Sequence, residues 1–150
     1  MRLLAILAAG CFISSMSLRI IDPVVPDISR DLHVDPASVA MLASFYAFPY
    51  ALAQPALGAL GDSLGKARII KIALGVLSLC LAASALAPTL AALALARLVG
   101  GAAAGGIIPL AFAIVGDRFA MSERQFALSR VLTAIIGGQM IGSIGSGFVA

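Results

Sequence analysis

The 150-residue chain is 61% hydrophobic and 11% charged, with a mean hydropathy of +1.09, whereas a soluble domain is roughly 25% charged. A soluble fold of this length cannot keep so much apolar surface out of water, so the composition excludes one and predicts lipid as the solvent. The net charge of +3 does not indicate nucleic-acid binding, because the basic residues stand in short clusters between apolar runs.

Five apolar segments are long enough to cross a bilayer, whose hydrocarbon core takes about 20 helical residues. They predict an all-α membrane protein, a single transmembrane helix bundle over residues 1–150 with short loops and no soluble module. In chain order the predicted spans are Leu3–Val25, Ser38–Leu60, Ile69–Ala87, Leu90–Val115 and Phe126–Ala150.

The first predicted span opens with Arg2 and an apolar run that also resembles a signal peptide. Because the run continues past Cys11 and four further apolar runs follow, we interpret it as a transmembrane span. Pro23 and Pro26 are predicted to end it, since proline interrupts helical hydrogen bonding. Cys11 and Cys80 each stand alone in an apolar run and are interpreted as packing residues.

Charge patterning predicts the orientation of the spans. Basic residues fall at the amino terminus and in alternate gaps, whereas the other gaps carry acids or no charge. By the positive-inside rule the amino terminus is cytoplasmic, and Ala150 lies at or near the outer face. The basic residues on the predicted inner side are Arg2, Lys66, Arg68, Lys71, Arg118, Arg124 and Arg130.

The loop between the second and third predicted spans reads GALGDSLGKAR over residues 58–68. Gly58 and Gly61 let a helix end approach a neighbour, and Gly65 permits a sharp turn. Asp62 is an acid at the membrane boundary, where it needs a basic side chain or the positive end of another helix. By composition alone, the segment also fits an ordinary charged inner loop.

This segment resembles the signature loop of the major facilitator superfamily, G-x-L-[AG]-D-x-x-G-[RK]-x-[RK], which follows the second span in that family. The family often has a base where Ser63 and Ala67 stand. The resemblance implies a latch that holds the two halves of a transporter closed on the inside. We expect Asp117, on the neighbouring inner loop, to pair with Lys66 or Arg68. The residues that match the motif are Gly58, Leu60, Gly61, Asp62, Gly65, Lys66 and Arg68.

The resemblance extends along the chain. Arg97, followed by Gly100 and Gly101, resembles a second family motif whose arginine is linked to proton transfer. Residues 116–124 resemble the acid-to-base loop after the fourth span, with Ala120 in place of its usual proline. The chain is therefore similar to the amino-terminal part of a major facilitator transporter, five spans of an incomplete half.

In the fifth span, residues 138–147 read GQMIGSIGSG and resemble the antiporter motif G-x-x-x-G-P-x-x-G-G. Ser143 replaces its proline and Ser146 replaces a glycine, so antiport and symport both stay open. The opening segment 19–26, RIIDPVVP, is similar to bacterial exporters of drugs or of sugars of the arabinose type. The resemblance implies export of a small molecule across the inner membrane, driven by the proton gradient without a cofactor.

Small residues recur at four-residue spacing in the fourth and fifth spans, as Gly101 with Gly105 and as Gly138 with Gly142. Such pairs let helix backbones approach closely, and Gly147 extends the second row. Tight packing and surfaces that slide during transport are both consistent with them. In the isolated chain we expect these glycine-rich faces to meet lipid where partner helices belong.

An ionisable residue inside a span costs roughly 2.5–3.5 kcal/mol on insertion scales and marks a candidate functional site. Arg97 has either a functional role or a packing role with its head group snorkelled to the outer interface. Arg19 and Asp22 share a helix face and either form a neutral helix end or take up the coupling proton. Tyr46 and Gln54, eight residues apart, are predicted to line the same cavity as these charged residues.

Two other classes of function remain as alternatives. An intramembrane enzyme needs a nucleophile or metal ligands at membrane depth, and the sequence has no HExxH or GxSxG motif, so we predict no catalytic residue and no metal site. A non-transporting membrane fragment or assembly subunit also fits the short length. Because related transporters have two six-span halves, we expect these residues to need further spans or a partner chain. The other expected partners are the bilayer and a small-molecule substrate.

Overall fold

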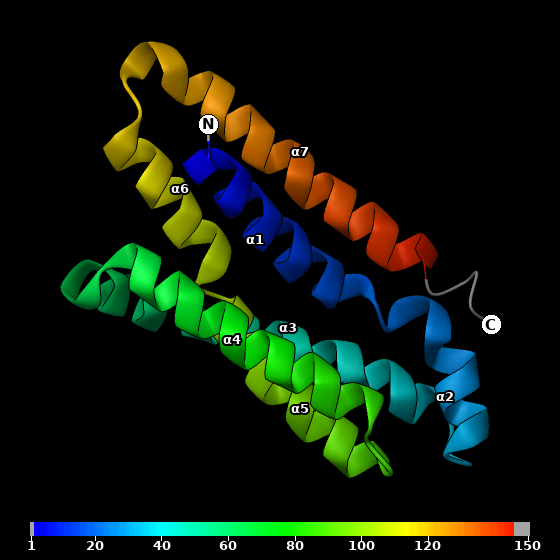
Figure 1. Ribbon diagram of the computed structural model, residues 1–150. Coiled ribbons are helices and arrows are strands. Elements are labelled where there is room, and N and C mark those ends of the chain that lie inside the picture. The colour runs from blue at the N-terminus through cyan, green and yellow to red at the C-terminus, as the bar shows by residue number, and fades with distance from the viewer. Residues whose placement is uncertain (1, 146–150) are drawn as a thin grey trace.

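The computed structural model describes residues 2–145, and in this range it contains helices and no strand. Five helical stretches of the described residues are long and apolar enough to cross a membrane, which confirms the predicted all-α membrane fold. The elements in chain order (Figure 1) are α1 (Arg2–Arg19), η1 (Asp22–Val24), α2 (Val25–Asp31), α3 (Pro36–Leu64), α4 (Lys66–Ala85), α5 (Leu90–Ala104), α6 (Ile107–Arg118) and α7 (Met121–Gly145).

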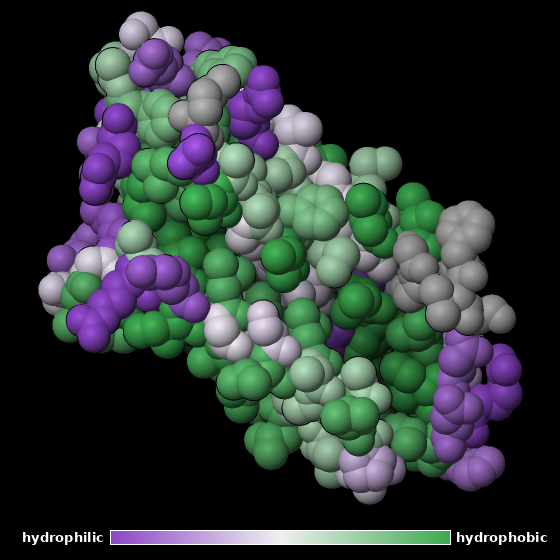
Figure 2. Space-filling model, in the orientation of Figure 1, coloured by the Kyte–Doolittle hydropathy of each residue, from purple (hydrophilic) through white to green (hydrophobic). Residues whose placement is uncertain are grey.

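The surface has the polarity that a bilayer requires. Figure 2 shows hydrophilic residues gathered at the two ends of the molecule and a hydrophobic band between them. Large apolar side chains are exposed along the apolar helices, among them Phe48, Leu79 and Leu95. Because exposing such side chains to water is unfavourable, the band identifies the surface that faces lipid or neighbouring helices.

The first span is interrupted at its prolines, but it does not end there. α1 stops at Arg19, a short 3₁₀ turn carries Pro23, and α2 then runs from Val25 to Asp31. Pro26 is compatible with α2 because it stands in the first turn, where a backbone N–H has no helical partner. The prediction that the two prolines end the helix is therefore wrong, and the helical segment extends past residue 25.

The fourth span contains a break that we did not predict. α5 ends at Ala104 and α6 begins at Ile107, so Gly105 and Gly106 separate two shorter helices. Pro109 explains the break, because proline has no N–H to donate to the carbonyl four residues earlier, which belongs to Gly105. The two glycines add the backbone freedom that the interruption needs.

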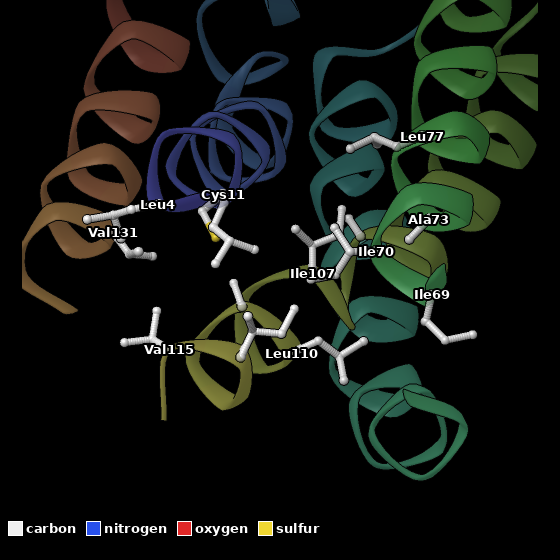
Figure 3. Close-up of a cluster of buried hydrophobic side chains, with 14 of the residues drawn as sticks. Leu4, Cys11, Ile69, Ile70, Ala73, Leu77, Ile107, Leu110, Val115 and Val131 are labelled. Carbon is white, nitrogen blue, oxygen red and sulfur yellow. The ribbon is translucent and has the colours of Figure 1, made fainter. Parts of the chain in front are cut away.

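The helices pack in two groups joined by α6. In Figure 1, α1 lies along α7, while α3, α4 and α5 lie together, and α6 contacts helices of both groups. The main core forms where these groups meet (Figure 3), and its buried side chains include Cys11, Ile107, Leu110 and Val131. Cys11 is fully buried in this core, as expected for a packing residue.

Glycines set the close approach of α5 to α3. An ideal Cβ at Gly101 would contact the backbone carbonyl of Tyr46, and one at Gly105 would contact that of Tyr50. In both cases the neighbouring atoms are backbone atoms, which cannot move aside as a flexible side chain does. The glycine-rich face of the fourth span is therefore covered by α3 and does not meet lipid, contrary to our prediction.

The fifth span uses its glycines in the same way against α1. A Cβ at Gly138 would contact the carbonyl of Phe12, and one at Gly142 would lie 2.6 Å from the carbonyl oxygen of Met16. This face is also covered from within the chain. The prediction that this face meets lipid is wrong. We expected its partner helix to lie outside these residues, whereas α1 packs against it. Gly147 lies outside the described residues.

Candidate functional site

The signature loop becomes a one-residue turn between two long helices. Gly65 ends α3 with a φ of +96°, and its N–H donates to the carbonyl of Gly61 at 3.0 Å. A residue with a side chain is strained at this φ, so glycine fits the turn. α4 begins at the next residue, Lys66, which places its side chain one turn beyond Asp62.

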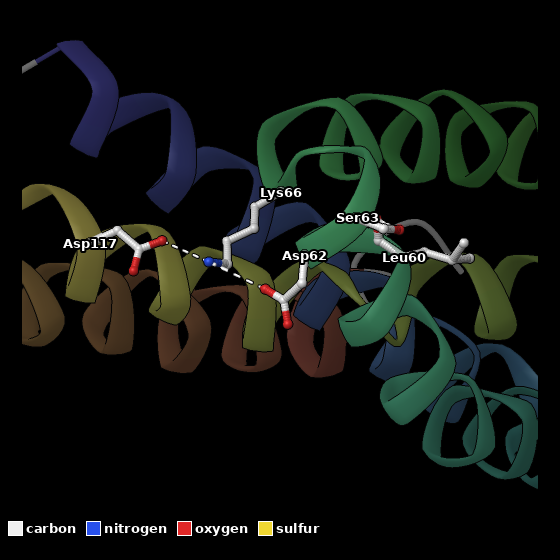
Figure 4. Close-up of polar contacts among 5 residues, drawn as sticks. All are labelled: Leu60, Asp62, Ser63, Lys66 and Asp117. Atoms are coloured by element: carbon white, nitrogen blue, oxygen red, sulfur yellow. Dashed lines mark hydrogen bonds and ion pairs between the residues drawn. The ribbon is translucent and has the colours of Figure 1, made fainter.

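Lys66 joins two carboxylates at this end of the bundle. Its Nζ lies 2.7 Å from Oδ2 of Asp117 and 3.3 Å from Oδ1 of Asp62 (Figure 4). The side chain of Lys66 is 24% exposed, while Asp62 and Asp117 are 72% and 56% exposed. The lysine is thus the partly covered centre of the cluster, and the expected pairing of Asp117 with Lys66 is present.

A surface cavity of about 410 Å³ lies beside this cluster and contains charges of both signs. Arg68 and Arg118 line it together with the cluster, and Leu3 of α1 closes one side. Three parts of the fold that are distant in the chain therefore meet here, the first helix, the α3–α4 turn and the end of α6.

The matching motif glycines have different surroundings. Gly61 packs against the Leu110 side chain of α6, whose Cδ2 would clash with a Cβ at Gly61. Gly58 has no atom within 4 Å of the corresponding position, so close packing in this structure does not explain it. Leu60 is exposed, and its carbonyl accepts a hydrogen bond of 3.2 Å from the Ser63 hydroxyl (Figure 4).

Arg124 makes a contact beside the cluster that the sequence did not lead us to predict. Nη2 of Arg124, in the first turn of α7, donates to the carbonyl of Gly116 at 2.6 Å. Carbonyls in the last turn of a helix have no partner within it, so Arg124 completes the bonding of α6 directly beside Asp117. The sequence signal is an arginine placed eight residues after that glycine.

A second polar cluster surrounds Arg97 in α5. The side chain is almost fully buried, with 3% of its surface exposed. Its Nη1 donates to the carbonyl of Ser17 in α1 at 2.7 Å, and its Cζ lies 5.1 Å from the ring centroid of Tyr46 in α3. The head group is thus held between three helices rather than extended to an interface.

The other predicted cavity residues are only partly brought together. Nη1 of Arg19 lies 3.3 Å from Oδ2 of Asp22, and both side chains are exposed, by 52% and 40%. Tyr46 is buried and Gln54 is exposed, so the two side chains have different surroundings, and a common cavity stays a prediction. Eight residues make two helical turns and a further rotation of about 80°, which is enough to separate them.

Comparison with known proteins agrees with the fold. The family model of the Major Facilitator Superfamily matches residues 7–150. The chain belongs to this superfamily. Its five apolar helices and its turn at Gly65 are thus those of a major facilitator protein.

Curated relatives of this major facilitator chain include bacterial drug-resistance proteins. Multidrug resistance protein 2 of Bacillus subtilis is 28% identical over 97% of the chain and 36% of its own length. Multidrug resistance protein 1 of the same organism is 29% identical over 98% of the chain and 38% of its own length. Quinolone resistance protein NorA of Staphylococcus aureus is 26% identical over 97% and 37%. The chain spans less than two fifths of these relatives.

The two clusters of this major facilitator chain stand near opposite ends of the fourth span. Arg97 lies in the second turn of α5, whereas Asp117 lies in the last turn of α6, twenty residues further along the span. At 1.5 Å per residue this is at most about 30 Å of helix, and less in a straight line because the span is broken at Gly105 and Gly106. Any coupling between them therefore has to pass through the helices.

Proposed function

We propose that this chain is the amino-terminal part of a proton-driven exporter of small, drug-like molecules in a bacterial inner membrane. Support comes from relatives whose names state multidrug or quinolone resistance and which match 97–98% of the chain. In this proposal the amino terminus and the α3–α4 turn face the cytoplasm, in line with the clustering of basic residues at that end.

The observation that carries the proposal is the bridge made by Lys66. One ammonium group holds a carboxylate four residues before it and a second one 51 residues after it, at the end of the bundle where a transporter has to open and close. Because charged contacts of this kind are half-exposed, they form and break at a modest free-energy difference. The cluster thus suits a contact that is made in one conformation and lost in another.

The coupling proton, in the same proposal, is taken up at the far end of the first span. Asp22 is an exposed carboxylate paired with Arg19 at 3.3 Å, so protonation of Asp22 would release the arginine. A gradient-driven exporter needs such an acid that is accessible from the outer side. The proton gradient supplies the energy, and no cofactor is required.

A chimera gives the sharpest test, because the chain matches little more than a third of its relatives. Residues 7–150 would replace the matching segment of the Bacillus subtilis Multidrug resistance protein 2. In everted membrane vesicles we expect the chimera to accumulate fluorescent lipophilic cations or a quinolone when the lumen is acidified, and to lose this uptake on adding a protonophore. The 150-residue chain alone, inserted at an equal level, should not accumulate them.

Two substitutions in the chimera connect the transport to the Lys66 cluster. Asp62→Asn should reduce gradient-driven uptake strongly with no loss of membrane insertion, because it removes one of the two acids that Lys66 holds. Gly75→Ala is the matched control, since a Cβ at Gly75 meets nothing within 4 Å. Normal uptake by the Asp62 variant would refute the latch, and an inserted chimera that moves none of the probes would refute the exporter.

A further inference from the structure

A close contact of α5 with α3 places Arg97 over an aromatic ring. A Cβ at Gly101 would lie 3.0 Å from the carbonyl carbon of Tyr46, so only a glycine leaves room for the α3 backbone there. Arg97 stands four residues before Gly101, one turn away on the same face of α5. Its Cζ consequently lies 5.1 Å from the Tyr46 ring centroid, within the range of a cation–π contact.

The buried charge of Arg97 interacts with the Asp22 carboxylate through space, without a direct contact. Among residues 2–145, no acid lies within ion-pair distance of its guanidinium. Its Nη1 donates instead to the carbonyl of Ser17 at 2.7 Å. Ser17 is one of the last four residues of α1, whose carbonyls lack a partner within the helix and carry the negative end of its dipole. Arg97 therefore acts as a cap that one span provides for another.

We propose that Tyr46 is a positioning residue whose ring holds Arg97 in place as the cap of α1. The cap then stabilises the break that Pro23 introduces in the first span, since α1 ends at Arg19, two residues after the bonded carbonyl. Through Tyr46, α3 thus controls the junction that carries Arg19 and Asp22. This inference concerns contacts within the chain and does not depend on the proposed transport function.

The ring, rather than the hydroxyl, is the part of Tyr46 that acts. The Tyr46 hydroxyl lies near the Ser17 side chain, yet it makes no hydrogen bond of normal geometry with any residue of the range 2–145. The Ser17 hydroxyl donates to the carbonyl of Ile13 at 2.8 Å. Because the hydroxyl contributes no bond to the cap, phenylalanine at position 46 should replace tyrosine.

The first test measures backbone amide exchange of residues 18–22 in the detergent-solubilised chain. Loss of a hydrogen bond from a charged donor should raise this exchange about tenfold or more in Tyr46→Leu and in Arg97→Met. Tyr46→Phe should leave it unchanged. So should Tyr50→Leu, which removes an aromatic ring one turn away that stacks on Tyr46 at 6.3 Å. Since Tyr46 acts through Arg97, the double variant Tyr46→Leu with Arg97→Met should equal Arg97→Met alone.

A second test separates positioning from simple packing. Fluorinated phenylalanines at position 46 keep the shape of the ring and weaken the negative charge on its face, so exchange at residues 18–22 should rise stepwise with fluorination. The Arg97 guanidinium protons should resonate upfield with any aromatic ring at position 46 and lose this shift in Tyr46→Leu. Two results would overturn the proposal. One is amide exchange at residues 18–22 that does not change with fluorination. The other is a double variant whose effect equals the sum of the effects of Tyr46→Leu and Arg97→Met. The fluorinated series decides the matter even if Tyr46→Leu fails to fold.

Discussion

Gly101→Ala and Gly75→Ala form a matched pair that tests the packing of the fourth span. Both add one methyl group to a helix, but at Gly101 the new Cβ would meet the carbonyl of Tyr46, whereas at Gly75 it meets nothing within 4 Å. Because the obstacle at Gly101 is backbone, the two helices have to separate before alanine fits. The structure therefore predicts opposite effects of the same chemical change.

The magnitude follows from two terms. Replacing glycine by alanine within a helix stabilises it by roughly 0.5–1 kcal/mol, and this gain applies at both positions. Overpacking a tight contact costs about 1–3 kcal/mol, and this cost applies at Gly101 alone. The helix term cancels in the comparison, so Gly101→Ala should be less stable than Gly75→Ala by about 1–3 kcal/mol, and Gly75→Ala should be slightly more stable than the unmodified chain.

Unfolding in mixed micelles with increasing SDS, followed by circular dichroism, measures this difference. We expect the midpoint to fall for Gly101→Ala and to rise slightly for Gly75→Ala, with the slope of the transition unchanged. Equal midpoints for the two variants would show that the backbone contact between α3 and α5 does not form. A second alanine at Gly105, whose Cβ would contact the Tyr50 carbonyl, should lower the midpoint of Gly101→Ala further.

Three further outcomes are expected. Asp117→Asn should speed acylation of the Lys66 amine by a water-soluble reagent, because it removes the carboxylate 2.7 Å away; an unchanged rate relative to Lys71, which is exposed, would contradict the bridge. Gly65→Ala should destabilise the chain by about 1–2 kcal/mol in the same SDS titration, since its φ is +96°. Reporter domains fused after Arg124 should stay in the cytoplasm and those fused after Thr89 should be exported, and the reverse would overturn the orientation.

Hydropathy was sufficient to predict the five spans, because lipid forces every long apolar segment to satisfy its backbone as a helix. The interruptions were harder to predict. The break at Gly105 and Gly106 depends on Pro109 removing one donor, a local effect that a hydropathy window averages away. At Pro23 we expected an end, but the chain resumes as α2 because Pro26 stands where no N–H is needed.

The two clusters differ in how far the sequence predicted them. Lys66 and Asp117 carry opposite charges on neighbouring loops at one end of the bundle, so their pairing follows from charge and topology together. Arg97 bonds to the carbonyl of Ser17, and a backbone carbonyl leaves no trace in the residue types. Its second contact, with the ring of Tyr46, depends on the rotation of α3, which an eight-residue spacing does not define.

Gly101 connects the packing of α5 with the position of Arg97. Gly101 was predicted as a packing residue and Arg97 as a candidate functional residue, yet the structure makes them parts of one arrangement, since the contact at Gly101 brings the Tyr46 ring beneath Arg97. A substitution that widens the α3–α5 contact should therefore also loosen the cap on α1. Gly101→Ala ought to raise amide exchange at residues 18–22 as Tyr46→Leu does, whereas Gly75→Ala ought to leave it unchanged. In this part of the chain, the position of the buried Arg97 charge therefore depends on how closely α5 packs against α3.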